Sequence, residues 1–183
     1  MLNTSKNMFK KRENVTDIEE GNLLSPKFDN DGLIPVITTC SKTKEILMHG
    51  YMNVEALKKT IETKEAHYWS RSRNQIWHKG KTSGFVQKVI EVRIDDDQDA
   101  VWLTVDIGSG SSCHVGYRSC FYRSVPLGKI DNAREIKMKF EEKEKKFDPK
   151  HPYCTNWPVK NERRSTGILS GSDDNNDDPD DSN

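Results

Sequence analysis

The sequence has no run of about 18 apolar residues, the length that a membrane-spanning helix needs. Its beginning, MLNTSKNMFKKREN, has no apolar stretch long enough for a secretory signal. Cysteine is also scarce, with four residues in 183. We therefore expect a cytoplasmic protein without membrane contact, in which cysteines act as ligands, nucleophiles or core residues and not as a disulfide framework.

Apolar residues are few for a fully folded chain, since 33% are hydrophobic and 32% are charged, so part of the chain is expected to be tail. The formal net charge is 0, but the final stretch GSDDNNDDPDDSN holds six aspartates and no base. Without these six, 29 basic and 23 acidic residues leave a net charge of +6. A mildly basic body suits a phosphorylated or otherwise anionic ligand, although many surfaces without a ligand look the same.

The apolar runs LIPVITTC (33–40) and EILMHGYM (45–52) are joined by SKTK and predict a strand hairpin. Asn53 then fits the N-cap of a helix. Apolar residues recur in that helix at helical spacing: Val54, Leu57 and Ile61.

Two later runs, VIEVRI (89–94) and AVWLTVDI (100–107), alternate apolar and polar residues. This period predicts two half-buried strands joined across DDDQD, and CFYRSV is a further strand candidate. The expected fold is therefore α+β: a strand-rich single domain with one core helix.

The ends of the chain differ from this central part. Residues 1–28 are polar and without periodicity, which predicts a flexible polar arm before a domain at 29–130. The stretch NAREIKMKFEEKEKKF has helical propensity but few large apolar residues on one face, so 131–150 is expected to be a charged, solvated helix. Residues 151–183 are expected to be a mostly disordered acidic tail.

The acidic turn IDDDQDA is the first group with possible chemistry. Asp95, Asp97 and Asp99 alternate, so in an extended chain their side chains share one side. Three carboxylates that close repel each other unless a cation lies among them, and a hard cation such as Mg²⁺ prefers oxygen ligands. The alternative is an acidic, solvated hairpin turn without an ion.

The stretch CHVGYRSC carries two of the four cysteines and a histidine. Cys113 and Cys120 could bind one zinc ion if the loop between them folds back, which Gly116 would allow. His114 could be a further ligand or a general base. The alternative is a pair of small buried cysteines beside a partly buried histidine.

The stretch HYWSRSRNQIWHKGKTSG mixes basic, hydroxyl and aromatic residues. Arginine binds phosphate oxygens well, hydroxyls add donors, and tryptophan rings accept a nucleobase. Similar mixtures occur on surfaces that bind RNA. A basic strand with tryptophans in the core would give the same pattern.

The order of these groups resembles one family. AHYWSRSRNQIWHKGKTSG, then VQKV, then a D-x-D-x-D turn, then CHVGYRSCFYR is similar to phosphoribosyl-AMP cyclohydrolase of histidine biosynthesis. EILMHGYMNVEALKKTIETKEAHYWSRSR extends the resemblance upstream, so that it covers about residues 30–125. The resemblance implies a zinc- and magnesium-dependent hydrolase that opens the adenine ring of phosphoribosyl-AMP between N1 and C6. It also implies an intertwined homodimer with metal sites shared between subunits, and no nucleic-acid partner.

The resemblance also implies roles for residues at matching positions. Cys113 and Cys120 match zinc ligands, and His114 matches the histidine implicated in catalysis. The three alternating aspartates of the acidic turn match magnesium ligands: Asp95, Asp97 and Asp99. Segment 70–83 matches the part that holds the substrate phosphates, and a tryptophan face can accept the base. The expected substrate-binding residues are Trp69, Arg71, Arg73, Lys79, Thr82 and Ser83.

The chain departs from the family at Asp96, where the family has the cysteine that is its third zinc ligand, usually from the partner subunit. A carboxylate can bind zinc, so we expect Asp96 to complete a Cys2Asp site across the dimer; the alternative is that zinc and activity are lost together. Phe85 also replaces a residue that is often polar, and Cys40 and Cys154 lie outside the matching motif and receive no role. Two alternatives therefore stand beside the cyclohydrolase: a divergent hydrolase or deaminase of another adenine nucleotide, and a non-catalytic nucleotide-binding homologue.

Overall fold

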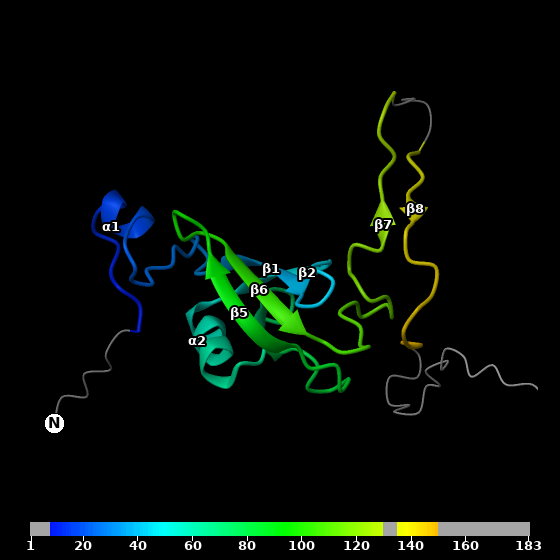
Figure 1. Cartoon of the computed structure of the whole chain (residues 1–183), viewed down its shortest axis with the longest axis horizontal. Helices are drawn as coiled ribbons and strands as arrows, with labels where there is room; N and C mark the ends of the chain where they lie inside the picture. The colour runs from blue at the N-terminus through cyan, green and yellow to red at the C-terminus, as the bar shows by residue number, and fades with distance from the viewer. Residues whose placement is uncertain (1–7, 130–134, 150–183) are drawn as a thin grey trace, which may run out of the picture.

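Four strands form the central sheet, in the order β2-β1-β6-β5, in a computed structural model that describes residues 8–129 and 135–149 (Figure 1). The strands are β1 Ile34–Cys40, β2 Ile46–Met52, β5 Lys88–Ile94 and β6 Val101–Asp106. β1 pairs antiparallel with β2 and parallel with β6, and β6 pairs antiparallel with β5. The expected hairpin and the two expected later strands are therefore confirmed.

Helix α2, Val54–Thr63, is the expected core helix. It begins where the side chain of Asn53 accepts a hydrogen bond from the Ala56 amide at 2.8 Å, and it buries Ala56 and Leu57. A second hairpin, of β3 His67–Ser70 and β4 Gln75–His78, packs next to β2 and α2. The class is α+β, as expected, and no helix in the described part of the chain is long and apolar enough to cross a membrane.

Strand β5 departs from the simple alternation. A β-bulge between Val89 and Glu91 breaks the register with β6, and Ile90 is 64% exposed. Val92, two residues further, is also exposed. The alternation in VIEVRI predicts that Ile90 and Val92 share a buried face. This is wrong for the single chain, in which β5 is the edge strand of the sheet.

The expected flexible arm is wrong for residues 8–28. Phe9 is buried against the core, and its ring lies 6.4 Å from that of Phe28. The buried Gln98 accepts a hydrogen bond from the Ser25 amide at 2.6 Å and donates one to the Ile18 carbonyl at 3.0 Å. The short helix α1, Val15–Glu19, lies in this segment, which a few irregularly spaced apolar anchors hold in place.

The expected solvated helix over 131–150 is also wrong in its described part, 135–149. The chain is extended there, and β8 Lys139–Phe140 pairs with the short strand β7 Arg123–Ser124 in an arm that projects from the body (Figure 1). The ring of Phe140 packs on the stacked rings of Tyr117 and Tyr122, so tertiary contacts override the helical propensity. The expected acidic tail lies outside the described residues.

Candidate active site

The loop that follows β6 folds back on itself and brings two thiols together. The Ser112 amide donates to the Arg118 carbonyl at 2.9 Å, and the Cys113 amide donates to the Tyr117 carbonyl at 3.2 Å. Gly116 sits in the turn with φ +105°, a conformation that favours glycine. As a result the thiols of Cys113 and Cys120 lie close enough to influence each other's charge.

These two thiols lie in a partly enclosed site. Cys113 is buried, and although Cys120 is exposed as a residue, its Sγ lies 3.9 Å from the Ser112 carbonyl. Burial and the neighbouring Cys113 raise the pKa of the Cys120 thiol to about 11. Next to them the loop is held by Glu142, whose carboxylate accepts hydrogen bonds from the amides of Arg118 and Ser119 at 2.8 and 2.9 Å.

Lys79, one of the expected substrate-binding residues, is buried beside the thiols. The residue is 6% exposed, and its Nζ donates a hydrogen bond of 2.7 Å to the Ser112 carbonyl. Burial lowers the pKa of Lys79, while the anionic forms of Cys120 and Cys113 would raise it. Lys79 and Arg73 both lie over the Trp77 ring, 4.9 and 5.9 Å from its centre, but Lys79 is buried whereas Arg71 and Arg73 are exposed.

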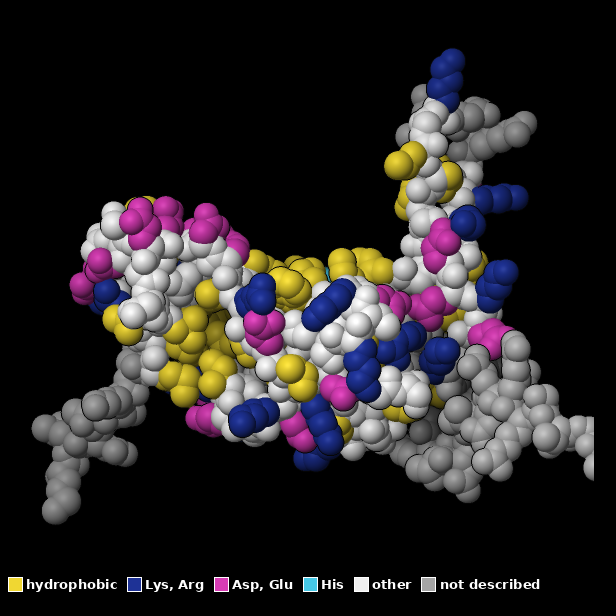
Figure 2. Space-filling model, in the orientation of Figure 1, with side chains coloured by type: hydrophobic (Ala, Val, Ile, Leu, Met, Phe, Trp, Pro, Cys, Tyr) yellow, Lys and Arg dark blue, Asp and Glu magenta, His cyan; other side chains and the backbone are white. Residues whose placement is uncertain are grey.

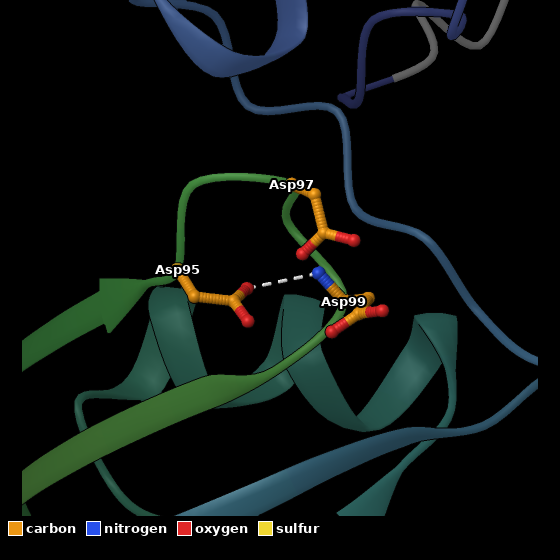
Figure 3. A group of neighbouring side chains, drawn as sticks. All are labelled: Asp95, Asp97 and Asp99. Atoms are coloured by element: carbon orange, nitrogen blue, oxygen red, sulfur yellow. Dashed lines mark hydrogen bonds between the residues drawn. The ribbon is translucent and has the colours of Figure 1, made fainter.

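The acidic turn between β5 and β6 gathers three carboxylates. Oxygen atoms of Asp95, Asp97 and Asp99 all lie within 4.8 Å of one another. Figure 3 shows the three side chains gathered at the turn. Asp95 also accepts a hydrogen bond of 2.9 Å from the Asp99 amide, which fixes the turn. The ammonium group of Lys27 lies 3.3 Å from Asp97 and 3.1 Å from Asp99, so a cation from the N-terminal segment already occupies the edge of the cluster.

Asp96 belongs to neither group within one chain. It is exposed, and it is not among the carboxylates that cluster in the acidic turn. The turn lies at the start of β6, whereas the cysteine loop follows the end of that strand (Figure 1). At about 3.4 Å per residue the strand from Val101 to Asp106 spans about 17 Å, so Asp96 cannot reach the two thiols of its own chain.

The aromatic and basic segment lines a cavity of about 200 Å³ between β2 and the β3–β4 hairpin. It includes Trp69, Arg71 and Arg73 from the expected substrate-binding set. The rest of the lining comes from β2 and the hairpin: Met48, His49, Gly50, Tyr51, Tyr68, Ser70 and Trp77. The Arg71 guanidinium lies 4.1 Å from the centre of the Tyr51 ring, so the cavity combines positive charge with flat aromatic faces.

Other expected site residues lie outside that lining. Thr82 is exposed and Ser83 half-buried in the turn after β4, and His114 is exposed next to Cys113. Phe85 packs its ring 5.4 Å from that of Phe147 and against Gly110, where an added Cβ would lie 2.8 Å from the Phe85 ring. Phe85 therefore has a packing role and does not line the cavity.

Comparison with known proteins decides the family. The sequence model of the family described as phosphoribosyl-AMP cyclohydrolase matches residues 48–122. A protein named phosphoribosyl-AMP cyclohydrolase from Rhodopseudomonas palustris strain CGA009 is 51% identical over 137 residues, which are 75% of this chain and 89% of that protein. Proteins of the same name from Nitrobacter winogradskyi and Nitrobacter hamburgensis are 46% and 47% identical, over 75% and 74% of this chain and 92% and 90% of theirs. The chain belongs to the phosphoribosyl-AMP cyclohydrolase family.

Membership in the cyclohydrolase family makes the chain a hydrolase of histidine biosynthesis. The donors present indicate which metal ions each site would suit. The two neighbouring thiols, with the buried ammonium of Lys79 beside them, suit a metal that is bound by thiolates, such as zinc. In the acidic turn, the ammonium of Lys27 lies where a metal cation bound by the aspartates would lie. Within residues 8–129 and 135–149, the acidic turn is the only group of three or more such donors, so no third donor for the cysteine pair comes from these described residues of its own chain.

Sequence reasoning about this cyclohydrolase-family chain missed several residues of the site. Lys27 gave no signal, because its place beside the acidic turn depends on the packing of the N-terminal segment. Gln87 is a polar residue in the apolar stretch FVQKV, and that contrast was the available signal for its buried role beside Ser112. His49 and Tyr51 line the cavity from the run EILMHGYM, which predicted only one strand of a hairpin.

Proposed function

We propose that the protein hydrolyses the N1–C6 bond of the adenine ring in phosphoribosyl-AMP. The observation that carries the proposal is the convergence of Cys113 and Cys120, beside His114, in a chain 51% identical to a protein of that name. The cavity lined by Trp69, Arg71 and Arg73 offers aromatic faces to a base and guanidinium groups to phosphate oxygens. Thr82 and Ser83, in the turn after β4, would add hydroxyl donors.

In this proposal Cys113 and Cys120 hold a zinc ion together with Asp96 of a second copy. Zinc bound by these residues would lower the pKa of a bound water towards about 7 and so would supply a nucleophile at neutral pH. His114, exposed beside Cys113, accepts the proton that the attacking water loses. That proton is returned to N1 as the N1–C6 bond breaks, so one water molecule is consumed in each turnover.

The substrate's extra group explains why it would react and plain AMP would not. The phosphoribosyl group on N1 makes the ring electron-poor, so C6 is attacked more easily. Asp95, Asp97 and Asp99 are proposed to hold Mg²⁺ in exchange for the Lys27 ammonium. Since Phe85 packs away from the cavity, its presence does not favour a different nucleotide as substrate.

A homodimer is part of the same proposal. Asp96 is exposed and far along β6 from the thiols, so only a second copy can bring it to them. Large apolar side chains are exposed on the single chain, and Figure 2 shows hydrophobic surface on both the body and the projecting arm. Such exposure supports association with another chain.

The test is to incubate the purified protein with phosphoribosyl-AMP, zinc and Mg²⁺, and to analyse the products by chromatography and mass. We expect a ring-opened product that is heavier than the substrate by one water molecule. AMP, which lacks the group on N1, serves as the matched control and should remain unchanged. Intact phosphoribosyl-AMP after incubation with metal-loaded protein would reject this function.

A further inference from the structure

A buried chain of hydrogen bonds connects the core of the sheet to the cysteine loop. The Tyr68 hydroxyl contacts Thr38 Oγ1 at 2.7 Å and donates to Gln87 Oε1, also at 2.7 Å. Gln87 Nε2 donates to Ser112 Oγ at 2.9 Å, and Lys79 Nζ donates to the Ser112 carbonyl at 2.7 Å. These two bonds fix both the side-chain hydroxyl and the carbonyl group of Ser112. Ser112 immediately precedes Cys113, so they also hold the start of the cysteine loop.

Lys79 brings a positive charge into this chain without an obvious counter-ion. No carboxylate within the described ranges forms an ion pair with it, and the face of the Trp77 ring lies 4.9 Å from Nζ. An ammonium group removed from water is costly unless an anion compensates for it. The groups beside Lys79 that can become anionic are the thiols of Cys113 and Cys120.

We propose that Lys79 is a positioning residue for the metal: its ammonium group compensates the charge of the Cys113 and Cys120 thiolates and fixes the Ser112 carbonyl at the start of their loop. This inference rests on the proposed zinc site. Zn²⁺ with two thiolates and one carboxylate carries a net charge of −1, and Lys79 brings the buried group to neutrality. Outer partners of this kind orient the ligands of a metal and stabilise their charged forms.

The burial of Lys79 also argues against a direct contact with substrate phosphate. At 6% exposure its Nζ is directed to a backbone carbonyl of the protein, whereas Arg71 and Arg73 line the open cavity. Lys79 therefore acts through the metal ligands, and the arginines are the cations available to the nucleotide.

The experiment compares the full-length wild type with Lys79→Met, Lys79→Arg and the matched control Lys88→Met, which removes an exposed lysine at the start of β5. Zinc affinity is measured by competition with a chromophoric chelator, and thermal unfolding is followed with and without zinc. We expect Lys79→Met to bind zinc about 10- to 100-fold more weakly, as for the loss of other outer-shell partners. Lys79→Arg keeps the charge and should recover most of the affinity, and Lys88→Met should match the wild type.

Thermal unfolding separates this role from a purely structural one. For the metal-free protein, Lys79→Met loses a hydrogen bond but also removes an uncompensated buried charge, so its Tm should change little. Zinc should raise the Tm of Lys79→Met less than that of the wild type at the same zinc concentration, because the stabilisation follows the affinity. A large fall in the metal-free Tm with an unchanged zinc affinity would instead assign Lys79 to folding alone and overturn the proposal.

The remaining outcomes distinguish this proposal from the proposed function. If the wild type binds zinc and Lys79→Met binds it equally well, the role of Lys79 is wrong while the zinc site stands. If the wild type itself binds no zinc, the zinc site and the role of Lys79 both fall. Should Lys79→Met not fold, Lys79→Gln decides in its place, because equal zinc affinity of that neutral variant would equally overturn the proposal.

Discussion

Cys113 and Cys120 are separated by six residues, a looser spacing than the usual zinc-binding pair, yet their thiols meet. The left-handed Gly116 and two backbone hydrogen bonds close the loop between them. The sequence indicated the turn through this glycine, but not the buried ammonium of Lys79 beside the sulfur atoms. That contact joins Lys79 to Ser112, which lie 33 residues apart, and residue spacing does not encode it.

We predict that Cys113→Ser and Cys120→Ser each lose zinc and activity together. A neutral hydroxyl is a poor zinc ligand, so the loss should exceed the about 10- to 100-fold effect of removing an outer-shell partner. Zinc content by atomic absorption and turnover of phosphoribosyl-AMP check this. Cys40→Ser is the matched control, because Cys40 is a buried cysteine on β1 outside the loop, and it should keep its zinc. Full zinc content in both loop variants would contradict the assignment.

The acidic turn gives a second prediction for individual residues. Removing Mg²⁺ with a chelator that leaves zinc bound should abolish turnover, and adding Mg²⁺ should restore it, because three carboxylates need a cation among them. A variant with asparagine at positions 95, 97 and 99 should no longer respond to Mg²⁺. Undiminished turnover of that variant would reject a magnesium site in the turn.

Lys27→Met is the companion variant for the acidic turn. This variant lacks the ammonium that lies beside Asp97 and Asp99, so its acidic turn should bind Mg²⁺ more tightly than that of the wild type. The gain should be only a few-fold, because exposed ion pairs are weak. The Mg²⁺ concentration that gives half-maximal activity measures the change. A weaker response to Mg²⁺ would mean that Lys27 supports the metal site and does not compete with the ion.

At the scale of whole elements, helix α2 shows what local sequence determines. Its start at Asn53 was predicted from capping chemistry, and its buried Leu57 from helical spacing. The predictions for segments 8–28 and 135–149 were wrong. The few apolar side chains that anchor these segments, such as Phe9 and Phe140, pack on residues distant in the sequence and show no period. Local periodicity thus predicts elements with a continuous apolar face, and fails where isolated side chains anchor an irregular segment.

The N-cap of α2 can be tested by stability. Asn53→Ala removes the acceptor of the Ala56 amide and should lower the free energy of unfolding by about 1 kcal/mol, the usual effect of losing an N-cap. Urea denaturation followed by circular dichroism measures it. Asn53→Ser keeps an oxygen acceptor and should unfold close to the wild type. An equal loss in both variants would show that packing of the side chain, and not the cap, stabilises this end of the helix.

At the scale of the whole molecule, the single chain exposes large apolar side chains on its surface. Ile90 is 64% exposed and lines a groove of about 420 Å³ between α2 and β5, while Leu127 on the projecting arm is 99% exposed. A soluble monomer rarely exposes such side chains in groups. The separation of Asp96 from the cysteine pair points in the same direction, since the expected third ligand has to come from elsewhere.

The shared site predicts how damaged chains should complement each other. We expect Asp96→Ala and Cys113→Ser to be weak or inactive alone, the first because every site lacks its carboxylate and the second because every site lacks a thiolate. In a mixed dimer one site collects both changes, and the other combines an intact cysteine pair with an intact Asp96. After unfolding and refolding an equal mixture, half of the dimers should be mixed, so activity should return to about one quarter of the wild type, if the dimer is symmetric.

Controls make that recovery specific to sharing between chains. A mixture of Cys113→Ser with Cys120→Ser should stay inactive, because both residues belong to the same chain's loop and no mixed dimer contains an intact pair. Asp96→Cys should bind zinc more tightly than the wild type, since it supplies a third thiolate. A refolded mixture of Asp96→Cys with Cys113→Ser should be as active as a mixture of the wild type with Cys113→Ser. If the Asp96→Ala mixture recovers no more activity than its components, Asp96 does not act across the dimer. If Asp96→Ala alone binds zinc as tightly as the wild type, Asp96 is not a zinc ligand. The two thiolates would then hold the metal together with a donor other than Asp96.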